Sequence, residues 1–273
     1  MTELERLATQ IRIAQMKCFQ WRGFGHVGGS LSIADALAAL YGRLMKYDPK
    51  NPRWEGRDYL VMSKGHCGPG LYAALAVEGF FPEEWLKTLN EPHTKLPSHC
   101  DKNLTPGVDM TTGSLGQGAS LAAGMALGLK LDGRQNKVFC ILGDGECDEG
   151  QVWEMILFAS ARKLDHLVAF VDYNRKQLDG STDDILPLGE LDEKFRAFGW
   201  YAVQVDGNDP DAIVNAVEDG YKVQGSRPMA VILNTRKGCG VDFIEAMEFN
   251  HHINLSKEQA KEAIAALERR LGQ

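Results

Sequence analysis

The first twenty residues show the apolar spacing of an amphipathic helix. Apolar residues recur there at intervals of three and four, which places them on one stripe of a helix that we expect to end at 21–23. The residues of this stripe are Leu4, Leu7, Ile11, Ala14 and Cys18. Ser32, followed three residues later by Asp35, predicts the start of a second helix, because both side chains favour the exposed amide groups of a first helical turn.

Three short apolar runs predict buried strands. They occupy 137–142, 167–172 and 229–234, are rich in aliphatic and β-branched residues, and are separated by helical segments. Such runs are typical of a parallel sheet that is covered by helices on both faces. With a further short strand at 59–62, the pattern predicts an α/β fold built from βαβ units: a single domain over 1–273 with a mainly parallel central sheet flanked by helices.

Helical segments surround these predicted strands. We expect further helices at 68–78, 83–89, 116–131, 149–163 and 257–271. The third of these is mostly Gly, Ala and Leu, a composition that favours close packing against another backbone rather than contact with water. Ser256 and Gln259 resemble a capping box, so we expect 235–273 to form a C-terminal segment that contains histidines and ends in a helix. The loop at 91–112, rich in Pro, His and Gly, is long enough to suggest a function.

Composition narrows the function classes. The 273 residues are 44% hydrophobic and 25% charged, an ordinary globular balance, and the formal net charge of −7 disfavours general attraction to nucleic acid or anionic lipid. The N-terminus has neither a basic nor an apolar signal region, and no apolar run approaches the roughly 20 residues that span a bilayer. The six cysteines form no C-x-x-C pair, which fits a reducing environment better than a disulfide framework. We therefore expect a cytoplasmic protein.

Two glycine-rich motifs differ in their context. Residues 23–28 match G-x-G-x-x-G, but the dinucleotide-binding form of this pattern needs a preceding strand, and here a predicted helix precedes it. Residues 113–118 open the small-residue helix, where glycine either lets a ligand approach the backbone or simply allows tight packing. Neither motif by itself identifies a ligand.

An acidic turn after one predicted strand is expected to face an asparagine after the next. The first strand ends at Gly143-Asp144-Gly145, and Asn174 lies thirty positions after Asp144. One intervening helix brings both strand ends to the same edge of the sheet, where open α/β sheets bind ligands. Carboxylate, amide and main-chain oxygens, completed by diphosphate oxygens and water, suit Mg²⁺. Either motif alone is explained as a turn, and only their shared context favours a metal site.

Together with further blocks, this arrangement resembles the thiamine diphosphate motif in the N-terminal domain of the transketolase family. The blocks are GHVGGS at 25–30, SKGHC at 63–67, SHC at 98–100 and PGVDMTTGSLGQG at 106–118. The resemblance covers nearly the whole chain. It implies a Rossmann-like domain that binds thiamine diphosphate and Mg²⁺.

The resemblance implies a metal and diphosphate site. In the family, the metal is held by the aspartate of the Gly-Asp-Gly block, the later asparagine and a backbone carbonyl two residues beyond it. These positions match Asp144, Asn174 and Lys176, of which the lysine contributes its carbonyl rather than its ammonium. The same block assigns Gly143 and Gly145 to the cofactor, the latter through its amide to the diphosphate.

Other positions match the family's contacts to the rest of the cofactor and to a second subunit. Gly113 and Leu115 match backbone and packing positions around the thiamine rings, and Leu178 matches a residue that lies against the thiazolium. Glu149 and Glu154 match acidic positions near the subunit contact, although the exposed face of a helix explains both equally well.

Four histidines receive roles from the same resemblance. His66 matches the residue that donates to the diphosphate, while His26 and His99 match those that contact the donor ketose near its reacting carbon. A neutral imidazole donates at one nitrogen and accepts at the other, so it can orient hydroxyl groups or move protons. The family supplies a further active-site histidine near the C-terminus. The local sequence departs from the family pattern there, and we favour His252 over its neighbour His251.

The resemblance also implies a reaction and a partner. The reaction is transfer of a two-carbon ketol unit from a ketose, expected to be phosphorylated, to an aldose. A full transketolase has another domain that binds the aminopyrimidine, so we expect a split enzyme, an α2β2 heterotetramer in which this chain pairs with a separate pyrimidine-binding C-terminal subunit. Two alternatives stay open: the cofactor subunit of a related thiamine diphosphate-dependent 2-oxoacid enzyme, and a non-catalytic cofactor-binding module. The sequence does not choose among sugar phosphates and branched, deoxy or sulfonated sugars.

Overall fold

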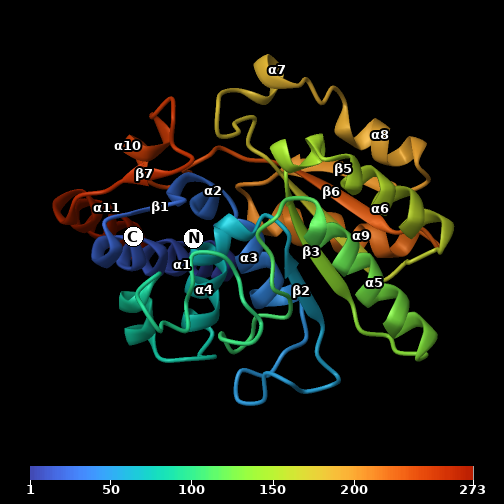
Figure 1. Cartoon of the computed structure of the whole chain (residues 1–273), viewed down its shortest axis with the longest axis horizontal. Coiled ribbons are helices and arrows are strands. Elements are labelled where there is room, and N and C mark those ends of the chain that lie inside the picture. The colour runs from blue at the N-terminus through green and yellow to red at the C-terminus, as the bar shows by residue number, and fades with distance from the viewer. Residues whose placement is uncertain (273) are drawn as a thin grey trace.

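Five parallel strands form the central sheet (Figure 1). In the computed structural model, which describes residues 1–272, their order is β2-β3-β4-β6-β5. The strands are β2 (Tyr59–Met62), β3 (Val138–Gly143), β4 (Leu167–Tyr173), β5 (Tyr201–Asp206) and β6 (Met229–Asn234). Gly143 of β3 is paired with Asp172 of β4, so these two strands end at the same edge. The predicted α/β fold with a parallel sheet is confirmed.

Helices cover both faces of the sheet. Successive side chains of a strand point to opposite faces, so β3 sends Phe139 and Ile141 into one apolar layer and Cys140 and Leu142 into the other. All four are fully buried, which explains why the strands are unbroken apolar runs in the sequence. The first layer is covered by α1 (Glu3–Arg22), α3 (Ala34–Ala39), α4 (Gly68–Val77) and α9 (Pro210–Val223). The second is covered by α5 (Gln117–Leu131), α6 (Gly150–Ala161) and α8 (Leu191–Ala197).

Short elements connect these layers. They are α2 (Val27–Ser32), a π-helical turn (Leu40–Leu44), α7 (Thr182–Ile185), α10 (Asp242–Glu245) and 3-10 turns at Gly65–Cys67, Glu83–Thr88 and Gly145–Asp148. The helix expected at 83–89 is therefore a 3-10 turn, whereas those expected at 68–78, 116–131 and 149–163 are α-helices within two residues of the predicted bounds. In the described part of the chain, no helix combines the length and the apolarity that a membrane crossing requires.

The C-terminal segment returns to the N-terminal helix. Strand β7 (Ile253–Asn254) pairs antiparallel with β1 (Phe24–Gly25), and α11 (Lys257–Leu271) packs against α1. The hydroxyl of Ser256 accepts from the amide of Gln259, whose side chain in turn accepts from the Ser256 amide, so the predicted capping box is confirmed. The G-x-G-x-x-G motif lies after α1 and outside the parallel sheet, so it lacks the dinucleotide-binding context.

The second helix is present where the sequence predicts it, with Asp35 in the first turn of α3, but the predicted capping role of Ser32 is wrong. Helix α3 follows Ile33, and no side chain caps its first turn. The Ser32 hydroxyl instead donates to Asp172 at 2.6 Å, and Asp35 forms a buried ion pair with Arg12. Tertiary contacts thus use both polar groups that the local pattern had placed at a helix start.

Helix α5 is only partly buried, which corrects the expectation that it avoids water. Its start packs tightly, because a Cβ at Gly118 would lie 2.6 Å from the Cα of Ser63. Farther along, Leu121 is 40% exposed, and Gly124 is exposed with open space at its Cβ position. The small residues of α5 therefore serve close packing at one end of the helix and leave an open surface on its outer side.

We expect Gly118→Ala to destabilise the fold by about 1–3 kcal/mol, the usual cost of overpacking a tight contact. The added methyl group would meet the Ser63 backbone, which cannot move aside as a flexible side chain could. Urea unfolding measures the change. Gly124→Ala, on the same helix, is the control and should raise stability by up to about 1 kcal/mol. Equal effects of the two substitutions would contradict this account of the packing.

Candidate functional site

A cavity of about 190 Å³ lies at the carboxyl ends of β3 and β4. Most of the predicted cofactor and metal residues line it, namely His66, Leu115, Gly143, Asp144, Gly145, Asn174, Lys176 and Leu178. Gly29, Lys64, Glu146, Gln177, Lys237 and His251 complete the lining. A larger groove of about 680 Å³ lies elsewhere, between segments 50–57 and 102–109, and contains none of the predicted site residues.

Asp144 is held at the tip of β3 with its carboxylate oriented by two backbone amides. Gly145 N–H donates to one oxygen at 2.8 Å, and Arg175 N–H donates to the other at 2.5 Å. The side chain is 2% exposed, and burial, reinforced by nearby Asp172, raises the pKa of Asp144 to about 7. A buried carboxylate of this kind favours a cation beside it.

Asn174 and Lys176 offer the two other oxygens that the sequence predicts. The amide nitrogen of Asn174 donates to Asp172 at 2.8 Å, which leaves its oxygen as the acceptor, here facing the Lys176 N–H at 3.1 Å. The carbonyl of Lys176 accepts from the Lys237 ammonium at 2.7 Å, so it already attracts a cation. Carboxylate, amide and carbonyl oxygens on one cavity form a donor set that fits Mg²⁺.

Lys237 is a site residue that the sequence analysis missed. It follows β6, is 5% exposed, and contacts both the Lys176 carbonyl and Nδ1 of His251, the latter at 3.0 Å. Burial lowers the pKa of Lys237 to about 8, although Asp144 pulls in the opposite direction. Its place in the sequence, just after a buried parallel strand, was the signal that could have identified it.

Glu146 is a second missed residue, and it ties the acidic turn to the glycine-rich loop. One carboxylate oxygen accepts from the Ser63 hydroxyl at 2.5 Å and from Gly116 N–H at 2.9 Å, while the other accepts from Gly143 N–H at 3.0 Å. Glu146 is 2% exposed, and burial raises its pKa. It therefore holds the walls of the cavity together.

The predicted histidines converge on one another. The ring centroid of His26 lies 5.3 Å from that of His66 and 5.7 Å from that of His99. Burial lowers the pKa of His26 to about 4 and also lowers the pKa values of His66 and His99. These imidazoles are therefore neutral near pH 7 and can both donate and accept hydrogen bonds.

Both C-terminal histidines reach this cluster, on different sides. The ring of His251 lies 5.3 Å from that of His26 and lines the cofactor cavity. The ring of His252 lies 4.9 Å from that of His26 and lines a small neighbouring cavity with Phe24. His252, which the sequence analysis favoured, thus lines the small cavity beside Phe24, whereas His251 lines the cavity that contains the predicted metal residues.

Two of the three positions predicted around the thiamine rings line the cavity. Gly113 is adjacent to His99, because a Cβ there would lie 3.5 Å from Cδ2 of His99. Leu115 and Leu178 line the cavity, and Leu178 is 61% exposed. Gly113 itself is not among the lining residues.

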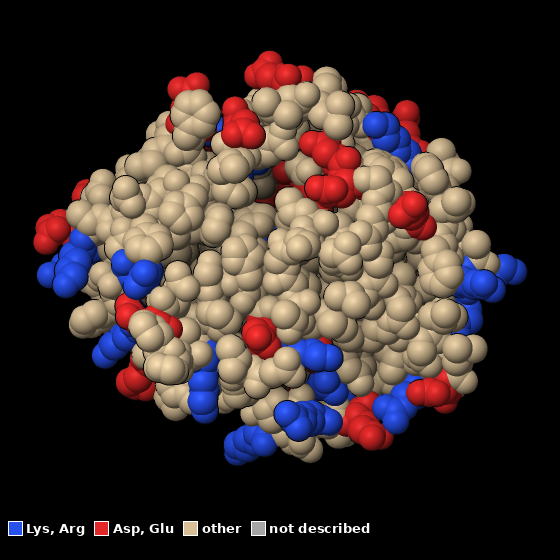
Figure 2. Space-filling model, in the orientation of Figure 1, with Lys and Arg blue, Asp and Glu red and all other residues tan. Residues whose placement is uncertain are grey.

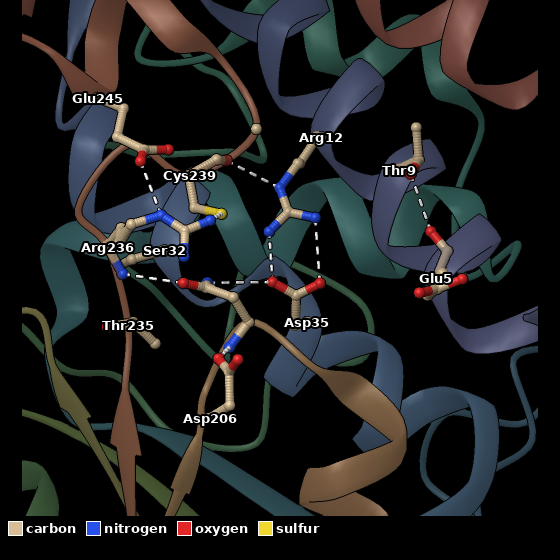
Figure 3. A network of polar contacts seen from close by, with 12 residues as sticks. Glu5, Thr9, Arg12, Ser32, Asp35, Asp206, Thr235, Arg236, Cys239 and Glu245 are labelled. Carbon is tan, nitrogen blue, oxygen red and sulfur yellow. Dashed lines mark hydrogen bonds and ion pairs between the residues drawn. The ribbon is translucent and has the colours of Figure 1, made fainter. Parts of the chain in front are cut away.

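A polar network, buried at Arg12 and Asp35 and exposed at Arg236, fixes the segment that carries Lys237 (Figure 3). The guanidinium of Arg12 faces the Asp35 carboxylate and donates through Nε to the Cys239 carbonyl at 2.9 Å. Arg236 donates to Glu245 at 2.7 Å. Because Arg12 belongs to α1, this network holds the turn after β6 against the N-terminal helix and keeps the adjacent residues at the cavity.

We expect the free energy of unfolding to fall between pH 7.5 and pH 5, in part through His251. Burial and the Lys237 ammonium lower the pKa of His251 to about 3, so the unfolded chain takes up a proton below its ordinary pKa of 6.5 while the folded protein does not. His251→Asn should reduce the pH-dependent loss by about 1 kcal/mol, half the full linkage because the ring is partly exposed. Urea unfolding at both pH values measures it, with exposed His93→Asn as control. An unchanged loss in His251→Asn would contradict the prediction.

Comparisons with known proteins agree with this geometry. A family model described as the transketolase, thiamine diphosphate binding domain matches residues 4–272. The 6-deoxy-6-sulfo-D-fructose transketolase subunit SqwG of Clostridium sp. (strain MSTE9) is 54% identical over 98% of this chain and 97% of its own length. An apulose-4-phosphate transketolase subunit from Actinobacillus succinogenes is 41% identical over 92% of this chain and 90% of its own.

Solved structures show the same similarity over a smaller share of their length. Transketolase from Campylobacter jejuni superposes with a TM-score of 0.90 at 29% identity and covers 100% of this chain, and that from Leishmania mexicana does so with 0.88 at 28% identity. The match spans 43% and 42% of those two chains. The chain therefore corresponds to about two-fifths of such proteins, while it matches nearly all of the two relatives named as subunits.

Proposed function

The chain belongs to the transketolase family, as the N-terminal subunit of a split transketolase, and from this premise we propose that it binds thiamine diphosphate through Mg²⁺ and transfers a ketol unit from an anionic ketose to an aldose. The observation that carries the proposal is the cavity where Asp144, Asn174 and the Lys176 carbonyl lie beside the histidine cluster. In this proposal, residues 1–273 form one diphosphate-binding domain, with 235–273 as its C-terminal segment.

In this proposal, the edge of the sheet holds the cofactor by its diphosphate end. Asp144, Asn174 and the Lys176 carbonyl bind Mg²⁺, and the Gly145 amide and His66 donate to the diphosphate. Gly143 allows the backbone to approach, while Gly113, Leu115 and Leu178 contact the rings. When bound, thiamine diphosphate supplies the nucleophilic carbon and accommodates the negative charge left on the two-carbon fragment.

The histidines act on the sugar. The bond between C2 and C3 of the ketose breaks, the C3 hydroxyl loses its proton as it becomes the carbonyl of the shortened aldose, and C1 and C2 are joined to the carbonyl carbon of the acceptor aldose. His26 and His99 orient the donor hydroxyls and take or return these protons, which their neutral state near pH 7 allows. His252 contacts the sugar from the outer side, and His251 from the side of the cofactor.

A pyrimidine-binding partner subunit completes the site in this proposal. The cavity of about 190 Å³ is smaller than the roughly 300–1,000 Å³ of complete ligand pockets, so further walls are needed. Apolar side chains are exposed on α5, on α6, at the cavity, at the end of α7 and in the C-terminal segment: Leu121, Leu157, Leu178, Ile185, Leu186 and Phe249. Figure 2 shows a broad uncharged area across the middle of this face, with most charged side chains near its edge.

We propose that this surface assembles two copies of each subunit into an α2β2 heterotetramer. Glu149 precedes α6 as its N-cap, Glu154 lies three residues before the exposed Leu157, and both fit positions at the contact between the two copies. We propose a cytoplasmic location for this assembly. All six cysteines are free and buried, which suits a reducing compartment.

The relatives favour a sulfonated donor over a phosphorylated one. The identity to the subunit named for 6-deoxy-6-sulfo-D-fructose is 54%, against 41% to one named for apulose-4-phosphate. We therefore propose 6-deoxy-6-sulfofructose as the preferred donor, which would leave a four-carbon sulfonated aldose.

The test uses the chain with its partner subunit, thiamine diphosphate and Mg²⁺. The sulfonated ketose, fructose 6-phosphate and pyruvate are supplied separately with one aldose acceptor, and the products are followed by mass spectrometry. We expect an acceptor lengthened by two carbons from the sulfonated ketose, with slower transfer from the sugar phosphate. Turnover of pyruvate alone would favour a 2-oxoacid enzyme, and cofactor binding without transfer from any donor would favour a non-catalytic module.

A further inference from the structure

A buried carboxylate lies directly beneath the predicted metal ligands. Asp172 is 0% exposed and follows Val171 in β4. Its oxygens accept hydrogen bonds from Ser32 at 2.6 Å, from the amide nitrogen of Asn174 at 2.8 Å, and from Lys64 and Thr235. These four donors come from four separate segments of the chain that meet at one carboxylate.

The contact with Asn174 determines which way that amide points. An asparagine side chain has a donor end and an acceptor end, whereas an ionised carboxylate only accepts. With Asp172 on one side, Asn174 must present its nitrogen to the carboxylate and its oxygen to the opposite side. The reversed amide would place an oxygen against the carboxylate and leave the Asn174 donor without this partner.

The carboxylate stays ionised because its surroundings compensate its charge. The Lys64 ammonium, in a side chain that is 1% exposed, forms a buried ion pair with Asp172. A buried charge is tolerated only when it is paired and hydrogen-bonded, and Asp172 satisfies both conditions. Asp172 therefore remains a carboxylate and accepts the hydrogen bond from the Asn174 amide nitrogen.

We propose that Asp172 is a positioning residue for the metal site, which acts through Asn174 by keeping the amide oxygen directed at the cation. The inference rests on the proposed function, since it takes Asn174 as a ligand of Mg²⁺. Groups that orient metal ligands in this way typically change metal affinity by 10–100-fold when they are removed. Asp172 is expected to act on the metal rather than on the sugar.

The test is the Mg²⁺ affinity of the assembled complex, measured by calorimetry with thiamine diphosphate present. Asp172→Asn should weaken Mg²⁺ binding by 10–100-fold, because the new amide no longer dictates the orientation of Asn174. Ser32→Ala removes another donor to the same carboxylate and should leave the affinity within threefold of the wild type. Thermal unfolding of each variant separates loss of fold from loss of metal.

A second pair of variants tests the same inference in case Asp172→Asn alone does not fold. Asp172→Asn leaves the Lys64 ammonium buried without its partner, so the double variant Lys64→Met/Asp172→Asn is compared with Lys64→Met, and a further loss of at least tenfold is expected. If these variants do not fold, a wild-type crystal structure with Mn²⁺ and thiamine diphosphate decides. It should show the Asn174 nitrogen on Asp172 and the Asn174 oxygen on the metal.

The outcomes separate this inference from the proposed function. Wild-type Mg²⁺ affinity in a folded Asp172→Asn variant would overturn the inference alone, as would an equal loss in Ser32→Ala or an Asn174 amide turned away from Asp172. Absence of Mg²⁺-dependent cofactor binding in the wild-type complex would overturn the proposed function itself.

Discussion

Asp144→Asn should abolish Mg²⁺-dependent binding of thiamine diphosphate, with a loss of affinity of roughly 100-fold or more. The loss should exceed the 10–100-fold that follows removal of a group merely supporting a metal ligand, because Asp144 supplies the only carboxylate of the predicted donor set. The substitution also replaces one of the two oxygens that accept from the Gly145 and Arg175 amides by a donor, so thermal unfolding of the variant is measured to separate loss of fold from loss of cofactor. Calorimetric titration of the assembled complex measures the change.

The matched control for this prediction is Asp148→Asn. Asp148 ends the same 3-10 turn as Gly145 but does not line the cavity. It should leave cofactor affinity within a few fold of the wild type. Normal cofactor affinity in a folded Asp144→Asn protein would remove this aspartate from the metal site.

Ketol transfer should require the partner subunit. We expect negligible activity from the purified chain and an increase of at least about 100-fold when the partner is added, because even one preorganised electrostatic contact contributes that much to rate. The cavity of about 190 Å³ in the single chain is smaller than the roughly 300–1,000 Å³ of complete ligand pockets. Steady-state assays across a titration of the partner measure the effect, and robust turnover by the chain alone would contradict it.

A surface substitution tests where the partner or second copy binds. Leu157, on the outer side of α6, is 57% exposed, and Leu157→Glu should weaken assembly and shift the concentration of partner needed for half-maximal activity. Val223, at the end of α9, is 60% exposed, and Val223→Glu should change neither the assembly nor this concentration. Analytical ultracentrifugation compares the two. Equal assembly of both variants would show that α6 lies outside the interface.

The strands predictable from the sequence are those whose side chains are buried on both faces. Apolar runs identified β2, β3, β4 and β6. Strand β5 was missed because it carries polar, half-buried residues such as Gln204, whereas β2, at the opposite edge of the sheet, is mostly buried. The predicted cap at Ser32 failed for a related reason. Its hydroxyl serves Asp172, which is 140 residues away in the sequence and near it only in the fold.

The site residues also divide into those that the strand order predicts and those that depend on contacts between distant segments. Asp144 and Asn174 could be predicted to share a sheet edge, because the order of parallel strands determines which strand ends meet. Glu146 and Asp172 could not, because their roles arise from contacts between segments far apart in the chain. For Lys237 only its place after a buried parallel strand was a signal, and its contact with the Lys176 carbonyl was not predictable. The choice between His251 and His252 likewise depends on how the C-terminal segment is held against α1, which no local pattern records.

The most direct test of the account is a crystal structure of the complex with its partner subunit, thiamine diphosphate and Mn²⁺ in place of Mg²⁺, with data collected to show anomalous scattering. We expect one anomalous peak within about 2.0–2.3 Å of an Asp144 oxygen, the Asn174 oxygen and the Lys176 carbonyl, with diphosphate oxygens on its other side. A cofactor bound in the complex with its metal away from these three oxygens would contradict it.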